Sequence, residues 1–169
     1  MKQRKGFLLI PAFSVIILDQ ITKALILSAF SLHDHAPVIR GFFNLVHVRN
    51  RGMAFGLMNQ ANNVFVFYGL TAATIVAVIL LLFWFTRLQE NDHRIIIGFS
   101  LIIGGAIGNL IDRVRLGEVV DFLDFYIGSY HWPAFNVADA SITVGTFWVA
   151  LNLFFQSRPP LNSGDKPLH

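Results

Sequence analysis

Residues 95–113 read IIIGFSLIIGGAIGNLIDR, and this stretch decides the fold. It carries no charged group from Ile95 to Ile111 and then runs directly into Asp112 and Arg113. A helix of about 20 mostly apolar residues crosses the roughly 30 Å hydrocarbon core of a bilayer. The stretch therefore predicts a membrane-spanning helix that ends with charged side chains at the edge of the lipid.

Three further stretches of the chain are long and apolar enough to span a membrane, at residues 7–30, 64–85 and 137–155. With residues 95–113 they predict an all-α membrane protein of one domain, residues 1–169, with four transmembrane helices. The proline-containing end, residues 157–169, is predicted to be a disordered tail.

Composition points the same way. Hydrophobic residues make up 54% of the chain and charged residues 14%, against roughly 25% charged in soluble domains. This apolar composition excludes disorder and a coiled coil. It also excludes a nucleic-acid partner, because the sequence pI of 9.6 reflects a net charge of only +3. The absence of cysteine excludes disulfides, thiolate metal sites and a cysteine nucleophile.

Charge predicts the orientation of the spans. Lys and Arg are denser in residues 1–6, 86–94 and 156–169 than in residues 31–63 and 112–133. The positive-inside rule then places both termini in the cytoplasm. Lys2, Arg4 and Lys5 before an apolar run also fit a cleaved signal peptide, but no small-residue cleavage site follows, so a retained span is expected.

The outer segment between the first two spans is predicted to contain a small β-sheet, at about residues 38–57. Val46 and Val48 alternate there with His47 and Arg49, which is typical of a strand. Irregular backbone cannot face lipid, so the sheet is expected at the extracytoplasmic membrane surface.

Several polar residues lie at the outer ends of the predicted spans, where an ionisable group is retained only for a partner or a function. Asp19 and Lys23 are four residues apart and can pair on one helical face. Asn109, Asp112 and Arg113 also share a face. A structural ion pair and a helix end among lipid headgroups explain these groups equally well.

Asp121 and Asp139 lie at the neighbouring ends of the third and fourth spans. If these spans are antiparallel neighbours, the two carboxyl groups can converge. Two carboxylates at close range in a low-dielectric site share one proton, so one can take a proton from water while the other protonates a leaving amine. This arrangement predicts peptide hydrolysis without a metal or a covalent intermediate.

The residues alone leave other functions open. No histidine lies within a predicted span, which argues against a Ser–His–Asp site, and no ligand spacing predicts a metal site. Asp124 could replace Asp121, being one helical turn further on. A carboxylate pair between spans also suits a small proton- or ion-coupled transporter, and a non-catalytic membrane assembly factor stays open.

Five short motifs follow one another from Asp19 to Asp139. They are DQITK at 19–23, NRGMAF at 50–55, GGAIGNLIDR at 104–113, VVDF at 119–122 and FNVAD at 135–139. In order and spacing the chain resembles the lipoprotein signal peptidase family, bacterial signal peptidase II. Arg51 and Met53 depart from the small residues frequent at those positions.

The resemblance implies four transmembrane helices, a small extracytoplasmic sheet and a short peripheral helical segment in a bacterial inner membrane. It implies that Asp121 and Asp139 are catalytic at the extracytoplasmic face, without cofactor or metal. The implied reaction cuts diacylglyceryl-modified prolipoproteins just before the lipidated lipobox cysteine, with membrane lipid as surroundings and globomycin as an inhibitor. The substrate-binding or supporting residues are then expected to be Asn50, Gly52, Asn109, Asp112, Arg113, Asn136, Asp19 and Lys23.

Overall fold

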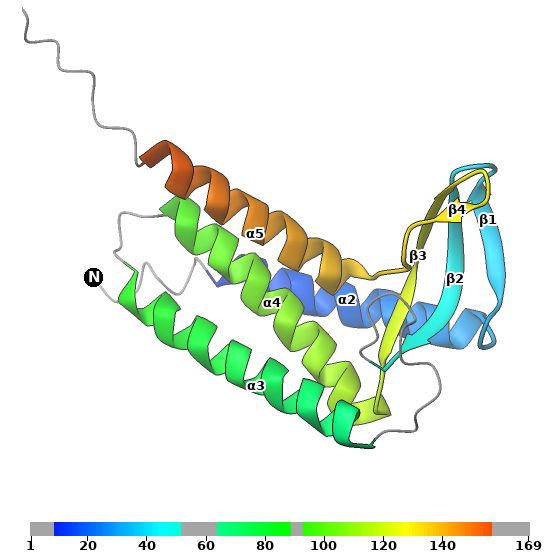
Figure 1. Ribbon diagram of the computed structural model, residues 1–169, viewed down its shortest axis with the longest axis horizontal. Coiled ribbons are helices and arrows are strands. Elements are labelled where there is room, and N and C mark those ends of the chain that lie inside the picture. Colours follow the sequence, from blue (N-terminus) through cyan, green and yellow to red (C-terminus); the bar gives the residue numbers. More distant parts are fainter. Residues whose placement is uncertain (1–8, 52–63, 89–92, 157–169) are drawn as a thin grey trace, which may run out of the picture.

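Four long apolar helices carry a small sheet at one end of their bundle (Figure 1). The computed structural model describes residues 9–51, 64–88 and 93–156. The helices are α2 (Ile10–Ala29), α3 (Val64–Arg87), α4 (His93–Leu116) and α5 (Val137–Gln156). Each is long and apolar enough to cross a membrane, so the predicted set of four spans is confirmed. The predicted tail, residues 157–169, lies outside the described residues.

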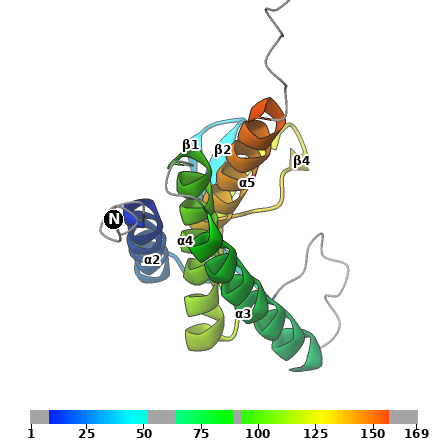
Figure 2. The same ribbon diagram turned by 90° about the vertical axis from the view of Figure 1, so that its left-hand side faces the viewer.

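Helix α4 holds the bundle together, because it contacts α2, α3 and α5. Glycines on α4 let the neighbouring backbones approach closely. A Cβ built on Gly104 would lie 2.7 Å from the carbonyl oxygen of Ala12 in α2, and one on Gly105 would collide with the carbonyl oxygen of Ala138 in α5. Figure 2 shows α2 and α3 on different sides of α4.

The outward faces of the helices are apolar, as lipid contact requires. Phe13 of α2 is 62% exposed and Phe147 of α5 is 68% exposed. Buried contacts between α3 and α4 centre on Phe85, Ile96 and Ile103. Besides the four long helices, the described ranges contain no helix, so the short peripheral segment is not located within them.

The sheet has four antiparallel strands in the order β1 (His35–Ile39), β2 (Phe43–Asn50), β3 (Val119–Ile127) and β4 (Tyr130–His131). The first two overlap the segment predicted as sheet, while residues 52–57 of that prediction lie outside the described residues. The other two come from the connection between α4 and α5, where the sequence analysis predicted no strand. Their start gives no alternating pattern, since residues 119–122 are all buried.

A small core fixes β3 against the helices. Val120 and Phe122 point to one face of the strand and pack with Ile26 near the end of α2. Asp121, between them in sequence, therefore points to the opposite face of β3. This packing positions the carboxyl group for the contacts described next.

Candidate active site

Asp121 and Asp139 reach the same region from different elements. Asp121 is the third residue of β3 and is 2% exposed, whereas Asp139 is half-buried in the first turn of α5. The charge of Asp139 acts on Asp121 through space. The expected convergence of the two carboxyl groups is therefore present in the structure.

Two asparagine side chains connect the aspartates in an unbroken chain of hydrogen bonds. Asn136 donates through Nδ2 to Oδ1 of Asp121 at 2.7 Å and to Oδ1 of Asn109 at 3.2 Å. Asn109 in turn donates through Nδ2 to Oδ1 of Asp139 at 2.7 Å. The relative position of the two carboxyl groups is thus set by side chains from α4 and from the start of α5.

Asn136 also begins helix α5. Its Oδ1 accepts the backbone N–H of Asp139 at 2.9 Å, which is the N-cap hydrogen bond typical of asparagine. One amide side chain therefore fixes the first turn of α5 with its oxygen and holds Asp121 with its nitrogen. Asn50 of β2 adds a second donor to Asp121, from Nδ2 to Oδ2 at 3.1 Å.

The surroundings of Asp121 favour its neutral form. Burial, followed by the nearby charge of Asp139, raises the pKa of Asp121 from 3.8 to about 7, although hydrogen bonds from Asn50 and Asn136 act in the opposite direction. Asp139 lies in the first turn of α5, where the positive end of the helix dipole stabilises a carboxylate. The two aspartates thus differ in environment, as an acid and a base must.

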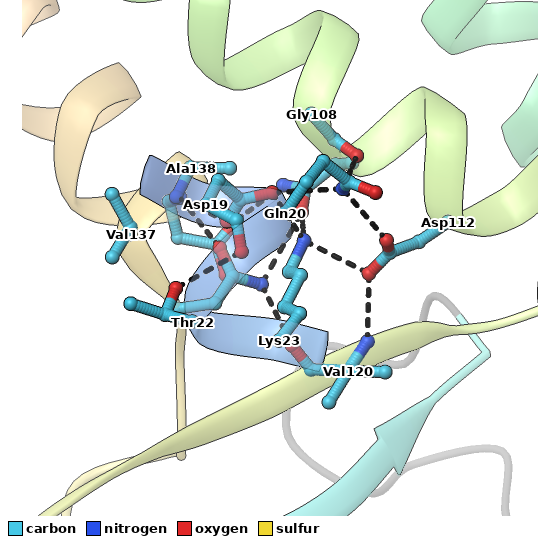
Figure 3. Close-up of polar contacts among 12 residues, drawn as sticks. Asp19, Gln20, Thr22, Lys23, Gly108, Asp112, Val120, Val137 and Ala138 are labelled. Carbon is cyan, nitrogen blue, oxygen red and sulfur yellow. Dashed lines mark hydrogen bonds and ion pairs between the residues drawn. The ribbon is translucent and has the colours of Figure 1, made fainter. Parts of the chain in front are cut away.

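A buried ammonium group lies at the centre of a second cluster of polar side chains (Figure 3). Lys23 is 2% exposed, and its Nζ lies 2.8 Å from Oδ2 of Asp19 and 2.8 Å from Oδ2 of Asp112. It also donates to Oδ1 of Asn109 at 3.1 Å. The lysine therefore joins α2 to α4 and contacts the asparagine that holds Asp139.

Each carboxylate bound to Lys23 also accepts a backbone N–H immediately before a candidate catalytic residue (Figure 3). Asp112 accepts from Val120 at 3.1 Å, the residue before Asp121. Asp19 accepts from Ala138 at 2.9 Å, the residue before Asp139. One ion-pair cluster thus fixes the backbone on the approach to both aspartates.

Asp112 belongs to the cluster around Lys23. Lys23, Val120 and the side chain of Gln20, at 3.0 Å from Asp112 Oδ1, occupy its oxygens. Arg113 instead lies half-buried within electrostatic range of both aspartates. In the described part of the chain, its guanidinium has no hydrogen-bond or ion-pair partner.

The prediction that Asp124 could replace Asp121 is wrong. It assumed a helix, whereas β3 is a strand, and a residue three positions along a strand points to the opposite face. Asp124 instead accepts a hydrogen bond from Asn44 at 2.9 Å and lies 2.8 Å from Nδ1 of His131.

The structure brings together seven of the eight predicted supporting residues, and the eighth, Gly52, lies outside the described residues. Two further residues of this region were missed. Gln20 donates to Asp19, to the Gly108 carbonyl and to Asp112, and its position within DQITK was a signal. Glu118 was not predicted either, and it forms ion pairs with Arg49 of β2 and with Arg51, which follows that strand.

Comparisons with known proteins agree with this geometry. The family described as signal peptidase (SPase) II matches residues 11–155. A lipoprotein signal peptidase of Syntrophus aciditrophicus (strain SB) is 44% identical over 153 residues, 90% of this chain and 95% of that protein. The lipoprotein signal peptidase of Syntrophotalea carbinolica is 51% identical over 141 residues, which cover 82% of this chain and 84% of that protein.

Solved structures show the same fold. A bacterial membrane enzyme solved by the in meso method at 2.3 Å superposes with a TM-score of 0.78 and 34% identity, covering 97% of this chain and 95% of the other. A second bacterial membrane enzyme, solved by the same method at 1.9 Å, superposes with a TM-score of 0.75 and 37% identity. The match covers 88% of this chain and 92% of the other. Fold, site and relatives together define a multi-pass membrane protease. The chain belongs to the signal peptidase (SPase) II family.

Proposed function

We propose that the protein is an aspartyl endopeptidase that removes the signal peptide from diacylglyceryl-modified prolipoproteins, cutting just before the lipidated lipobox cysteine. The names of the relatives, lipoprotein signal peptidase, support this substrate class. The observation that carries the mechanism is the hydrogen-bonded chain from Asp121 through Asn136 and Asn109 to Asp139.

In this mechanism, Asp139 is the general base and Asp121 the general acid. The ionised Asp139 removes a proton from a water molecule, whose oxygen attacks the scissile carbonyl carbon. Asp121, about half of which is protonated at pH 7 because its pKa is about 7, gives its proton from that form to the leaving nitrogen as the C–N bond breaks. One proton remains, on Asp139, and transfer of it back to Asp121 restores the starting state.

Nearby polar groups suit the binding of a peptide backbone. The guanidinium of Arg113 is available to hydrogen-bond a substrate carbonyl and to stabilise negative charge that develops on it. Asn50 and Asn109 hold the carboxyl groups of the aspartates and are close enough to take part. Gly52 stays a predicted binding position.

The position of the site fits a lipid-anchored substrate. The aspartates lie where the sheet meets the ends of apolar helices, so a precursor can bring its scissile bond there while its apolar segment stays in lipid (Figure 1). The proposal places this end at the extracytoplasmic face of the inner membrane and both termini in the cytoplasm. The higher density of cations in the opposite segments supports that orientation.

The test is to incubate the purified protein with a diacylglyceryl-modified precursor and to identify the products by mass spectrometry. We expect a free signal peptide and a product that begins with the lipidated cysteine, and we expect globomycin to block the reaction. The same precursor without its lipid is the matched control. Equal cleavage of both precursors, or a cut elsewhere, would refute the proposed specificity.

A further inference from the structure

Glu118 forms a second charged cluster close to the aspartates, separate from the one around Lys23. It lies between the end of α4 and the start of β3, next to Gly117, whose φ of +78° ends the helix. Its side chain is 11% exposed and accepts from Arg49 Nη1 at 2.8 Å and from Arg51 Nε at 3.2 Å. A buried carboxylate is thus bound by two guanidinium groups, one from Arg49 in β2 and one from Arg51 just after it.

The two arginines flank the residue that contacts Asp121. Side chains alternate between the faces of a strand, so Arg49 and Asn50 point to opposite faces of β2. Arg51, the residue after the strand, binds the same carboxylate as Arg49. The amide of Asn50 donates to Oδ2 of Asp121 at 3.1 Å. The register places Asn50 opposite Val119 and Arg49 opposite Val120, so Glu118 lies just beyond the last pair of this ladder.

We propose that Glu118 is a positioning residue, which binds the arginines on both sides of Asn50 and thereby holds the Asn50 amide on Asp121. The inference rests on the proposed peptidase function and adds a residue to it. Glu118 itself touches neither aspartate, so its effect on the reaction passes through Asn50.

The charges around Glu118 support this assignment. Burial alone would raise the pKa of Glu118, but hydrogen bonds from Arg49 and Arg51 outweigh it and lower the pKa below 4.5. The carboxylate is therefore ionised across the working pH range. Without it, the two arginines lose the anion that they share, and the end of β2 loses its ion pairs with the residue before β3.

The experiment compares Glu118→Gln, Glu118→Ala and Asn50→Ala by the pH dependence of kcat/KM for cleavage of the lipidated precursor. The hydrogen bond from Asn50 to the ionised form of Asp121 keeps the pKa of Asp121 down. Loss of this hydrogen bond therefore moves the alkaline limb of the kcat/KM profile to higher pH. We expect Glu118→Ala and Asn50→Ala each to shift that limb by about one pH unit and to lower kcat about tenfold. Glu118→Gln, which keeps an acceptor oxygen but no charge, should give a smaller shift in the same direction.

The double variant Glu118→Ala/Asn50→Ala tests whether the effect passes through Asn50. It should resemble Asn50→Ala alone, because the two changes remove one interaction. If the effects of the two substitutions multiply in the double variant, the proposal is overturned. It is also overturned if folded Glu118→Ala and Glu118→Gln both keep the wild-type alkaline limb. If Glu118→Ala does not purify as a folded protein, Glu118→Gln decides by the same criterion.

Asp124→Asn is the matched control, because Asp124 is another buried carboxylate of the same sheet and has its hydrogen bonds with Asn44 and His131. It should keep the wild-type pH profile, and the same shift in this variant would overturn the assignment to Glu118. The proposed function itself stands if the wild type cleaves the lipidated precursor and Asp121→Asn does not. An unchanged Glu118 series would then reject the positioning role alone.

Discussion

Replacing Lys23 by methionine tests the ion-pair cluster around this residue. Methionine keeps an unbranched side chain, one atom shorter than that of lysine, but leaves Asp19 and Asp112 buried without a counter-charge. The two carboxylates hold the N–H groups of Ala138 and Val120, so the substitution affects the backbone before both Asp139 and Asp121. We therefore expect it to lower stability and cleavage together.

The expected size follows from the two contacts. At 2.8 Å each, the gross attraction is about 6 kcal/mol per contact at an effective dielectric constant of 20. Desolvation of the three charges offsets most of it, and loss of one partner of a buried ion pair typically costs about 3–5 kcal/mol. Since Lys23 forms ion pairs with two carboxylates, we expect Lys23→Met to lower the free energy of unfolding by about 5 kcal/mol. This corresponds to between three and four powers of ten in the unfolding equilibrium constant.

The assay is denaturant unfolding in detergent micelles, followed by helix content, together with cleavage of the lipidated precursor. The triple variant Lys23→Met/Asp19→Asn/Asp112→Asn provides the comparison. It removes every charge of the cluster yet keeps oxygens that can accept the two backbone N–H groups, so it should regain much of the lost stability. A Lys23→Met protein as stable as the wild type, or a triple variant no better than the single one, would refute the reasoning.

Further changes test the site and its packing. Because the pKa of Asp121 rises from 3.8 to about 7 on folding, the stability it contributes is full below pH 3.8 and is lost as pH rises to about 7. Asp121→Asn should then be more stable than the wild type at pH 8, by on the order of 4 kcal/mol, with no gain near pH 3.5. Thermal unfolding measures both proteins at each pH, and a stability difference between variant and wild type that is the same at pH 8 and pH 3.5 would contradict this. Gly105→Ala should cost about 1–3 kcal/mol and reduce cleavage, since its methyl group collides with the Ala138 carbonyl. Gly69→Ala in α3, where a Cβ meets nothing within 4 Å, should leave cleavage unchanged and raise the free energy of unfolding by about 0.5–1 kcal/mol. Chelators should leave cleavage intact, whereas a loss that added zinc restores would favour a metal mechanism.

The sequence predicted the helices and the convergence of the aspartates well, because both depend on local signals. Long apolar runs identify spans by length alone. The placement of Asp121 and Asp139 follows once the third and fourth spans are antiparallel neighbours, and α4 and α5 do pack together.

The second half of the sheet could not be predicted in the same way. Residues 119–122 are buried on both faces of β3, so the alternation that marked β2 is absent. The error over Asp124 came from this, since a helical spacing was applied to a strand. The run of β-branched and aromatic residues before Gly128 was the signal that could have identified the strand.

The polar contacts needed the three-dimensional arrangement. Spacing predicted that Lys23 pairs with Asp19, but its second partner, Asp112, lies 89 positions further along the chain. The pairing of Glu118 with Arg49 and Arg51 likewise depends on the register between β2 and β3, which shifts at an irregularity between Leu45 and Val48. No local pattern specifies such a register.

The central claim is that two carboxyl groups carry the reaction, and the most direct measurement compares three single Asp→Asn variants on one lipidated precursor. We predict that Asp121→Asn and Asp139→Asn each abolish cleavage while remaining folded and membrane-inserted, and that Asp124→Asn cleaves at close to the wild-type rate. Turnover retained by either of the first two variants would contradict the account.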